Sequence, residues 1–228
     1  MSREPISAVL SDALMEAIGG RRVKVAVFLT FQFDPGFFEE ELLPLLFDQS
    51  FSHVPQIRVV QLEERLRSLK HLAVYFDRRG LTAEARPALL DYRRFGVQRH
   101  TGFFHTKNIL LLVENQEGAR YWDSLVFVTL SANLTKAGWW ENVEVAHMTE
   151  VPSGERCTFR RELLSLISRL KQEDSIPEEH LALEAIRSFL LGSVDEAVFF
   201  RKQGRWLAQL YLGQTNLPEF LHQNWKLS

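Results

Sequence analysis

The sequence predicts an α/β layered fold, in which a mixed β-sheet is flanked by helices and followed by a C-terminal helical pair. Up to about residue 150, apolar stretches rich in β-branched and aromatic residues, typical of buried strands, alternate with segments of helical periodicity. After Pro152 helical periodicity occurs twice in succession. We therefore divide the 228 residues into a core over residues 1–150 and an extension over residues 151–228, which either packs on the same domain or leads into a missing second half.

The chain begins with a predicted helix, strand and second helix. Apolar residues at helical spacing run over Ile6–Ile18 and end at a Gly-Gly pair, which suits a left-handed helix stop. The stretch Val23–Phe31 has the composition of a buried central strand. Asp34 and Pro35 then suit an N-cap and a first helical residue, and they predict an amphipathic helix to about Phe47.

Short strands and helices continue to alternate beyond this unit. Ile57–Gln61 predicts a second strand, Leu62–Leu69 a short charged helix and Leu72–Phe76 a third strand. Residues 78–100 are rich in arginine and interrupted by glycine and proline, so we expect loops and an edge of the sheet there.

Two strong strand candidates, Phe103–Val113 and Leu125–Leu130, are joined by a polar, glycine-containing link, as in a hairpin with a long loop. The remaining predicted elements are a strand over Asn142–Met148, helices over Phe159–Leu170 and Pro177–Leu191 with a capping box at Ser175–Glu178, a strand over Trp206–Leu212 and a helical turn over Leu217–His222.

The composition is that of an ordinary globular protein, with 46% hydrophobic and 25% charged residues and a formal net charge of -2. This charge argues against a general nucleic-acid coat, although local charge can still guide a phosphate into a cleft. Cys157 is the only cysteine, which excludes an intrachain disulfide and a cysteine-based zinc cluster. The longest unbroken apolar runs, such as Ile109–Val113, have five residues and are far too short to span a bilayer, and the N-terminus lacks the apolar core of a secretory signal. We expect a cytoplasmic protein without a membrane partner.

His105 and Lys107 stand two residues apart at the start of the apolar stretch Phe103–Val113. The period of two in a strand places both side chains on one face. An imidazole can act as nucleophile or proton carrier near neutral pH, and a neighbouring ammonium can neutralise a phosphoryl oxygen. The pair suits phosphoryl transfer, although a histidine at a strand end beside a solvated lysine is the simpler interpretation of these two residues taken alone.

A second polar group follows the next predicted strand. Ser131-Ala-Asn133 ends that strand, and Asn142-Val-Glu144 follows after eight residues. Together with the H-x-K pair, this order and spacing resembles the phospholipase D superfamily, whose motif has H-x-K on one strand, GS-x-N after the next and N-x-E beyond. The His-Thr-Lys beginning is nearest in motif to tyrosyl-DNA phosphodiesterase and bacterial phospholipase D-like nucleases. The resemblance implies a phospholipase D-like layered fold.

Two positions depart from the family pattern. Leu112 stands where the phospholipase form has an aspartate, and Leu130 stands where the family usually has glycine before the turn. These departures affect the expected activity more than the expected fold.

The resemblance implies a metal-independent phosphodiesterase without a cofactor. His105 would be either the nucleophile that forms a phosphohistidine or the acid that protonates the leaving oxygen. Lys107 and Asn133 would hold the nonbridging phosphate oxygens, Ser131 could assist, and Glu144 would orient an imidazole. Donors fixed in this way stabilise developing charge without reorganising. Taken alone, Asn133 could equally be a turn residue.

The segment before the motif carries local positive charge. Residues 78–107 contain seven Lys or Arg against two acidic residues, which suits a polyanion cleft but also an ordinary solvated face. We take Arg93, Arg94 and Arg99 as candidate contacts to nucleic acid, in particular DNA. Trp139 either belongs to the core or offers a stacking platform for bases.

The implied mechanism needs two histidines at one phosphorus, and no histidine other than His105 begins an H-x-K. A symmetric homodimer could bring two copies of His105 together, or a partner or missing half could carry the second motif. We expect a phosphodiesterase of nuclease type that acts on nucleic acid. The alternatives are a noncatalytic half-site module in a larger, defence-type complex and a phospholipase, which Leu112 and the lack of a basic amphipathic helix disfavour.

Overall fold

The computed structural model describes residues 9–47, 49–81, 86–99, 102–115, 123–173, 179–196, 218–220 and 222. Its centre is a six-stranded sheet in the order β3-β2-β1-β4-β5-β6. Strands β1, β2 and β3 are parallel to one another, whereas β4 is antiparallel to β1, β5 to β4 and β6 to β5. The strands are β1 (Arg22–Thr30), β2 (His71–Asp77), β3 (Arg93–Val97), β4 (Asn108–Glu114), β5 (Asp123–Leu130) and β6 (Ala146–Pro152). The sheet is therefore mixed.

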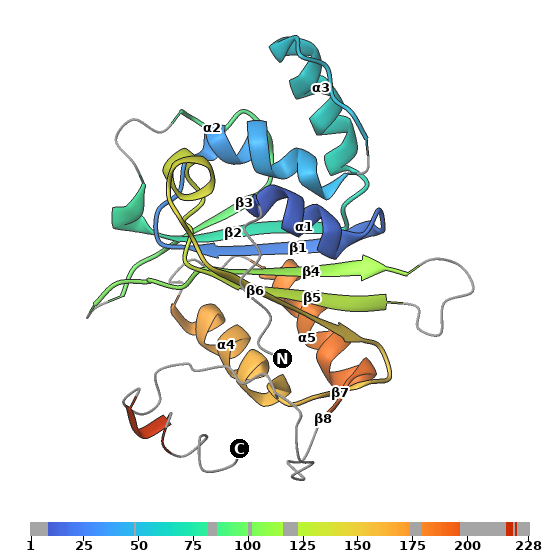
Figure 1. The fold of residues 1–228 in the computed structure, drawn as a ribbon, viewed down its shortest axis with the longest axis vertical. Helices are drawn as coiled ribbons and strands as arrows, with labels where there is room; N and C mark the ends of the chain where they lie inside the picture. Colours follow the sequence, from blue (N-terminus) through green and yellow to red (C-terminus); the bar gives the residue numbers. More distant parts are fainter. Residues whose placement is uncertain are drawn as a thin grey trace.

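Helices cover both faces of this sheet (Figure 1). One face carries α1 (Leu10–Ile18), α2 (Pro35–Phe37), the π-helical η1 (Phe38–Leu42), the 3-10 helix η2 (Leu43–Leu46) and α3 (Pro55–Leu66). The other face carries α4 (Arg160–Glu173) and α5 (Leu181–Ser193). Short elements complete the described part, namely η3 (Arg78–Gly80), η4 (Ala137–Glu141), and the parallel pair β7 (Arg156–Cys157) and β8 (Asp195–Glu196).

Two apolar cores sit on the two faces because successive side chains of a strand point in opposite directions. In β1, Phe28 packs into the core under α1, η1 and η2, whereas Val27 and Leu29 pack under α4 and α5. Each large side chain buried in this way contributes about 1.5–3 kcal/mol to folding. The central strands must therefore be apolar on both faces, as the sequences of β1 and β4 are.

The structure confirms the predicted α/β fold with a mixed sheet and a C-terminal helical pair. It also confirms the cap at Asp34, whose Oδ1 accepts a hydrogen bond from Phe37 N at 3.1 Å. The helix predicted after Asp34 forms as three successive pieces, α2, η1 and η2. The left-handed stop after α1 is Gly19, with φ of 63°.

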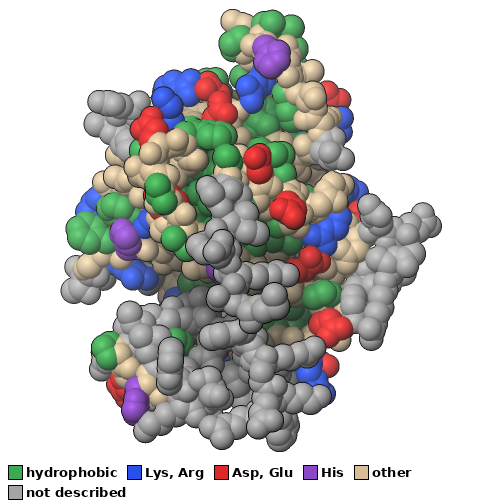
Figure 2. All heavy atoms as spheres, in the orientation of Figure 1, with side chains coloured by type: hydrophobic (Ala, Val, Ile, Leu, Met, Phe, Trp, Pro, Cys, Tyr) green, Lys and Arg blue, Asp and Glu red, His purple; other side chains and the backbone are tan. Residues whose placement is uncertain are grey.

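The strand predicted over Ile57–Gln61 is wrong, because these residues lie inside α3. Three apolar residues at helical spacing, Val59, Leu62 and Leu66, turn toward the core, and Pro55 suits the first helical turn. Helix α3 projects from the body of the molecule (Figure 1), and its projecting end shows hydrophobic side chains in Figure 2.

Two predicted strands begin later than expected. The strand predicted from Phe103 begins at Asn108, and the strand predicted from Asn142 begins at Ala146. The predicted capping box at 175–178, the strand over 206–212 and most of the link 114–124 lie outside the described residues, whereas residues 218–220 of the predicted last turn are helical. Within the described residues, no helix combines the length and apolar character needed to cross a membrane.

Candidate active site

The motif residues meet at one end of the sheet, where β1 and β5 end and β4 begins. Leu29 of β1 pairs with Asn108 of β4, and Asn108 pairs with Thr129 of β5. The segments just outside these pairs carry Phe31, His105 and Lys107, Ser131 and Asn133. The register of the strands thus brings side chains that are far apart in the sequence to the same end of the sheet.

His105 and Lys107 lie against each other. The Lys107 Nζ atom is 3.2 Å from Nε2 and 3.3 Å from Nδ1 of His105. Burial, and then the charge of Lys107, lower the pKa of His105 below its ordinary value of 6.5. Burial also lowers the pKa of Lys107, although the carboxylate of Glu144 acts in the opposite sense. At neutral pH the imidazole is therefore held in its uncharged form, which is the form that can attack phosphorus.

The end of β1 links the two halves of the motif. The Phe31 ring centroid is 5.1 Å from that of His105 and 6.0 Å from Lys107 Nζ. The next residue, Gln32, bonds Asn133 twice: its N–H donates to Oδ1 at 3.1 Å, and its Oε1 accepts from Nδ2 at 3.2 Å. His105 and Asn133 thus contact two consecutive residues, Phe31 and Gln32. The Asn133 amide has a fixed orientation, and within the described part of the chain one of its Nδ2 hydrogens is left for a ligand.

The turn that carries Asn133 is held by its neighbours. Thr30 Oγ1 accepts from Leu134 N at 3.1 Å and donates to Gln32 O at 2.7 Å. Gly138 in η4 lies so close that a Cβ there would stand 2.7 Å from Asn133 O and 2.9 Å from Asn133 N. A side chain at residue 138 would therefore displace the turn.

Ser131 and Glu144 form a pair at the border of the site. The Ser131 hydroxyl donates to the Glu144 carboxylate and accepts from Val145 N at 2.9 Å. Among the described residues, Glu144 bonds Ser131 and acts electrostatically on Lys107. Its expected role, the orientation of an imidazole, stays a prediction. The Ser131 hydroxyl is engaged by protein groups.

The residue pair Asp77 and Arg79 was not anticipated from the sequence. Asp77 ends β2, and its buried carboxylate bonds both Arg79 and the Phe104 amide just before His105. The available signal was an acidic residue at the end of a buried strand, next to two arginines. Gln32 and Phe31 were also missed, because a polar and an aromatic residue after a strand are common.

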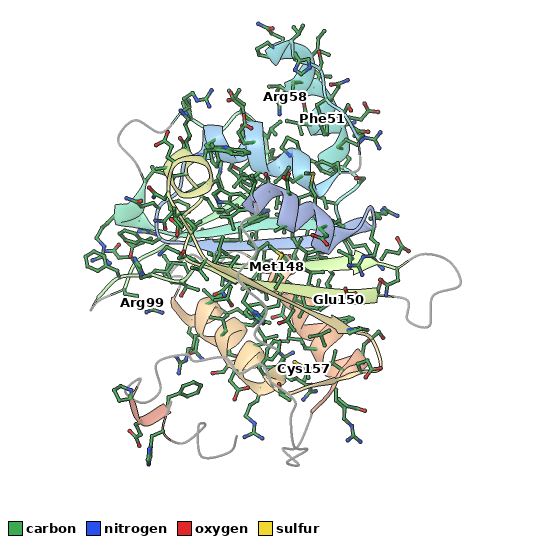
Figure 3. All side chains as sticks on the ribbon, viewed as in Figure 1. Phe51, Arg58, Arg99, Met148, Glu150 and Cys157 are labelled. Atoms are coloured by element: carbon green, nitrogen blue, oxygen red, sulfur yellow. The ribbon has the colours of Figure 1, made fainter. Side chains whose placement is uncertain are left out.

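The candidate substrate contacts divide into two groups. Arg99, labelled in Figure 3, lies by the motif: its guanidinium carbon is 5.7 Å from the Phe104 ring centroid. Arg93 and Arg94 begin β3, three strand spacings, or about 14 Å, from β4. Through β2 and β1, Arg94 is in register with Ile109 of β4, so this group is separated from the site across the sheet. The Arg94 guanidinium carbon lies 5.1 Å from the Tyr92 ring centroid.

Trp139 is not available as a stacking platform. Its side chain is 5% exposed and belongs to the core cluster under α1 and η1, because η4 turns it inward. The neighbouring Trp140 is 46% exposed, and Phe103 is 55% exposed beside His105. Within the described residues, no three His, Cys, Asp or Glu side chains gather as a metal ion would require.

Of the comparisons with known proteins, only the comparison with solved structures finds similar proteins. No family model matches the chain, and no curated protein matches its sequence. The solved structure of a mutant of yeast tyrosyl-DNA phosphodiesterase is similar with a TM-score of 0.50 and 14% identity, covering 79% of this chain. The chain spans only 37% of the length of that protein.

Two smaller proteins match less well in shape. The phospholipase D family member Nuc from Salmonella typhimurium has a TM-score of 0.40 and 14% identity, covering 71% of this chain and 84% of its own. NucT from Helicobacter pylori has a TM-score of 0.36 and 9% identity, covering 71% and 85%. With its mixed six-stranded sheet between helical layers, this chain has the fold of the phospholipase D superfamily.

Proposed function

We propose that this protein is a metal-independent phosphodiesterase of nuclease type, which acts on nucleic acid, in particular DNA, through a phosphohistidine intermediate. A second H-x-K half completes its active site. The observation that carries the proposal is the meeting of His105, Lys107 and Asn133 around the end of β1.

The chemistry follows from the state of each group. The neutral imidazole of His105 attacks phosphorus, a P–N bond forms, and the P–O bond to the leaving group breaks. Lys107 and the remaining Nδ2 hydrogen of Asn133 hold the nonbridging oxygens, where charge develops. A water molecule then attacks the phosphohistidine and releases His105, so that one phosphodiester and one water yield a phosphomonoester and an alcohol.

Each of these steps needs a second proton carrier. The leaving oxygen must take a proton in the first step, and the attacking water must lose one in the second. His105 is occupied by phosphorus between the two steps, so another histidine has to serve. We propose that it comes from a second copy of this chain in a homodimer or from a partner half with its own H-x-K.

The surface around Glu144 supports such an assembly. Val143 is fully exposed, Val145 is 74% exposed, and Trp140 is 46% exposed. Apolar side chains that gather at the border of a site are suited to burial against another protein surface. Docking there would also exclude water from the phosphoryl group.

Two features favour nucleic acid as the substrate. The arginine-rich segment brings Arg79 and Arg99 to the motif, where a polyanion would pass. The exposed Phe103 stands between Arg79 and Phe31. Aromatic and guanidinium groups together are common contacts to single-stranded bases.

A second candidate function is a noncatalytic half-site module in a larger, defence-type complex. The observation in its favour is the engagement of Ser131 by Glu144 and Val145, which leaves Lys107 and Asn133 as the phosphate donors of a single motif. Such a module would bind phosphate or nucleic acid without cleaving it.

An assay on single-stranded and duplex DNA in excess EDTA tests the proposal. We expect cleavage by the wild type to persist in EDTA and to disappear in His105→Ala. His53→Ala, which removes an exposed histidine next to α3, is the matched control and should cleave normally. Acid-labile phosphate trapped on the wild type alone would identify the intermediate. Folded wild type that binds DNA but never cleaves it would favour the half-site module.

A further inference from the structure

The residues that lead into His105 lie outside the sheet ladder. Strand β4 begins only at Asn108, so residues 102–107 need another source of fixation. A nucleophile must be held to well under an ångström of its productive position, because a displacement of about 1 Å can cost about 100-fold in rate. Two residues, Asp77 and Arg79, hold this segment in place, and together we call them the brace.

Asp77 is the first part of the brace. Its carboxylate is fully buried, and Oδ2 accepts from Phe104 N at 2.7 Å. Arg79 forms a two-pronged ion pair with it, in which Nε lies 2.9 Å from Oδ1 and Nη2 lies 2.9 Å from Oδ2. These hydrogen bonds, that of the Arg79 side chain foremost, lower the pKa of Asp77 to about 2, so the carboxylate stays charged over the working pH range.

Arg79 is the second part. Its Nη2 donates to Gly102 O at 2.6 Å, and its guanidinium carbon stands 4.2 Å from the Phe103 ring centroid. The Phe103 ring packs edge-on against Phe31, which in turn contacts the His105 ring. Asp77 at the end of β2 and Arg79 in η3 therefore hold residues 102, 103 and 104 in succession.

On the basis of the proposed function, we propose that Asp77 and Arg79 are positioning residues for His105. They act through the backbone of residues 102–104 and the Phe103–Phe31 contact, and they touch neither phosphorus nor the imidazole. Replacing either residue should therefore change the rate of the chemical step and the position of the His105 ring.

A matched control exists elsewhere in the chain. Glu39 is also a buried carboxylate, 4% exposed, and it accepts backbone N–H groups of two consecutive residues, Leu89 at 2.9 Å and Leu90 at 3.2 Å. Glu39→Gln removes the same kind of charge from a brace that holds a different segment. Loss of stability alone would affect both variants.

The first measurement follows the His105 ring by NMR of histidine-labelled protein, with its signal assigned by loss in His105→Ala. Asp77→Asn should shift or broaden this signal, because an amide has one acceptor oxygen where the carboxylate uses two. Glu39→Gln should leave it in place. Arg79→Gln replaces a half-exposed side chain, should fold in any case, and should move the same signal.

The second measurement separates kcat from KM on a DNA substrate. Asp77→Asn should lower kcat by about 10- to 100-fold while KM changes little, because the proposed substrate contacts Arg79 and Arg99 remain. Arg79→Gln should lower kcat by a similar factor and also raise KM, because Arg79 itself is a proposed contact to nucleic acid. An unmoved His105 signal in both variants would overturn the inference. A wild type without activity would refute a phosphodiesterase that this chain completes as a homodimer, and the NMR result would still decide whether the brace positions His105.

Discussion

The protonation state of His105 depends in part on the charge of Lys107, which the proposed function places beside a phosphate. Lys107 Nζ lies 3.2 Å from the imidazole, and its charge helps to lower the pKa of His105. In the proposed function the same ammonium donates to a phosphoryl oxygen, so one side chain would both keep the proposed nucleophile uncharged and attract its target. Burial lowers the pKa of Lys107, and the Glu144 carboxylate opposes this change because it favours the charged form of Lys107.

This arrangement gives a prediction for Lys107→Met. The pKa of His105 should rise toward 6.5, but only part of the way, because burial is the larger cause of its depression and remains. The acid limb of the pH–rate profile that needs neutral His105 should move to higher pH by the same amount. Titration of the His105 ring by NMR measures the shift.

Lys136→Met serves as the control for that titration, because Lys136 is an exposed lysine paired with Glu141. It should leave the His105 titration unchanged. A His105 pKa that falls or stays constant in Lys107→Met would contradict the electrostatic account. The sign for stability follows as well: a depressed histidine pKa means that the unfolded chain binds the proton more readily, so its contribution to folding is lost as pH falls below about 6.5.

At the scale of elements, the buried strands were predictable because their apolar side chains must fill two cores. The first half of helix α3 was not, although the helix predicted over Leu62–Leu69 overlaps its second half. Ile57–Gln61 contains β-branched residues that favour strands, and only the spacing of Val59, Leu62 and Leu66 indicates a helix. The late start of β4 has a similar cause, since Phe104 N bonds a carboxylate that no local pattern reveals.

The candidate site shows the same division. His105, Lys107 and Asn133 could be selected from their order and spacing, and the structure brings them to one end of the sheet. Gln32 could not, because its contact with Asn133 depends on the pairing of β1 with distant strands. Trp139 failed as a surface residue because a π-helical turn rotates it into the core.

The contact between η4 and the Asn133 turn can be tested by adding one methyl group. Gly138→Ala places a Cβ within 2.7 Å of Asn133 O, so the turn or η4 must shift, and we expect a loss of about 1–3 kcal/mol in unfolding free energy together with reduced cleavage. Urea unfolding and the DNA assay measure the two effects.

Gly192→Ala is the matched control for this test. Gly192 lies in α5, and no described residue outside its own helix comes within 4 Å of a Cβ built there. This substitution should leave cleavage intact and stabilise the helix by about 0.5–1 kcal/mol. Equal behaviour of the two variants would argue against close packing at Gly138.

At the scale of the whole molecule, the site lies on an outer end of a three-layered body, next to exposed Val143 and Val145. If a second copy completes the site, Val145→Glu should separate the dimer and abolish cleavage, because a charge would be buried against apolar surface. Light scattering across a concentration series measures the mass. Val60→Glu, at a position 63% exposed on α3, should change neither property.

A wild type that stays monomeric at all concentrations would exclude the homodimer and leave the partner half. A Val145→Glu chain that remains dimeric and still cleaves DNA would contradict the expected interface.

The central position of β1 has a consequence for how the chain reaches its native state. Residue 22 pairs with residue 114 and residue 29 with residue 108, while the parallel partner β2 lies between them in the sequence. Pairings across such sequence distances require large loops to close, and the chain loses this conformational entropy before the strand contacts stabilise it. Folding is therefore slow compared with helical proteins of this size. During synthesis, β1 has to wait for β4 to leave the ribosome. Until then, the backbone edge of β1 that will pair with β4 is unpaired and can pair with other chains. Aggregation would compete with folding during this interval.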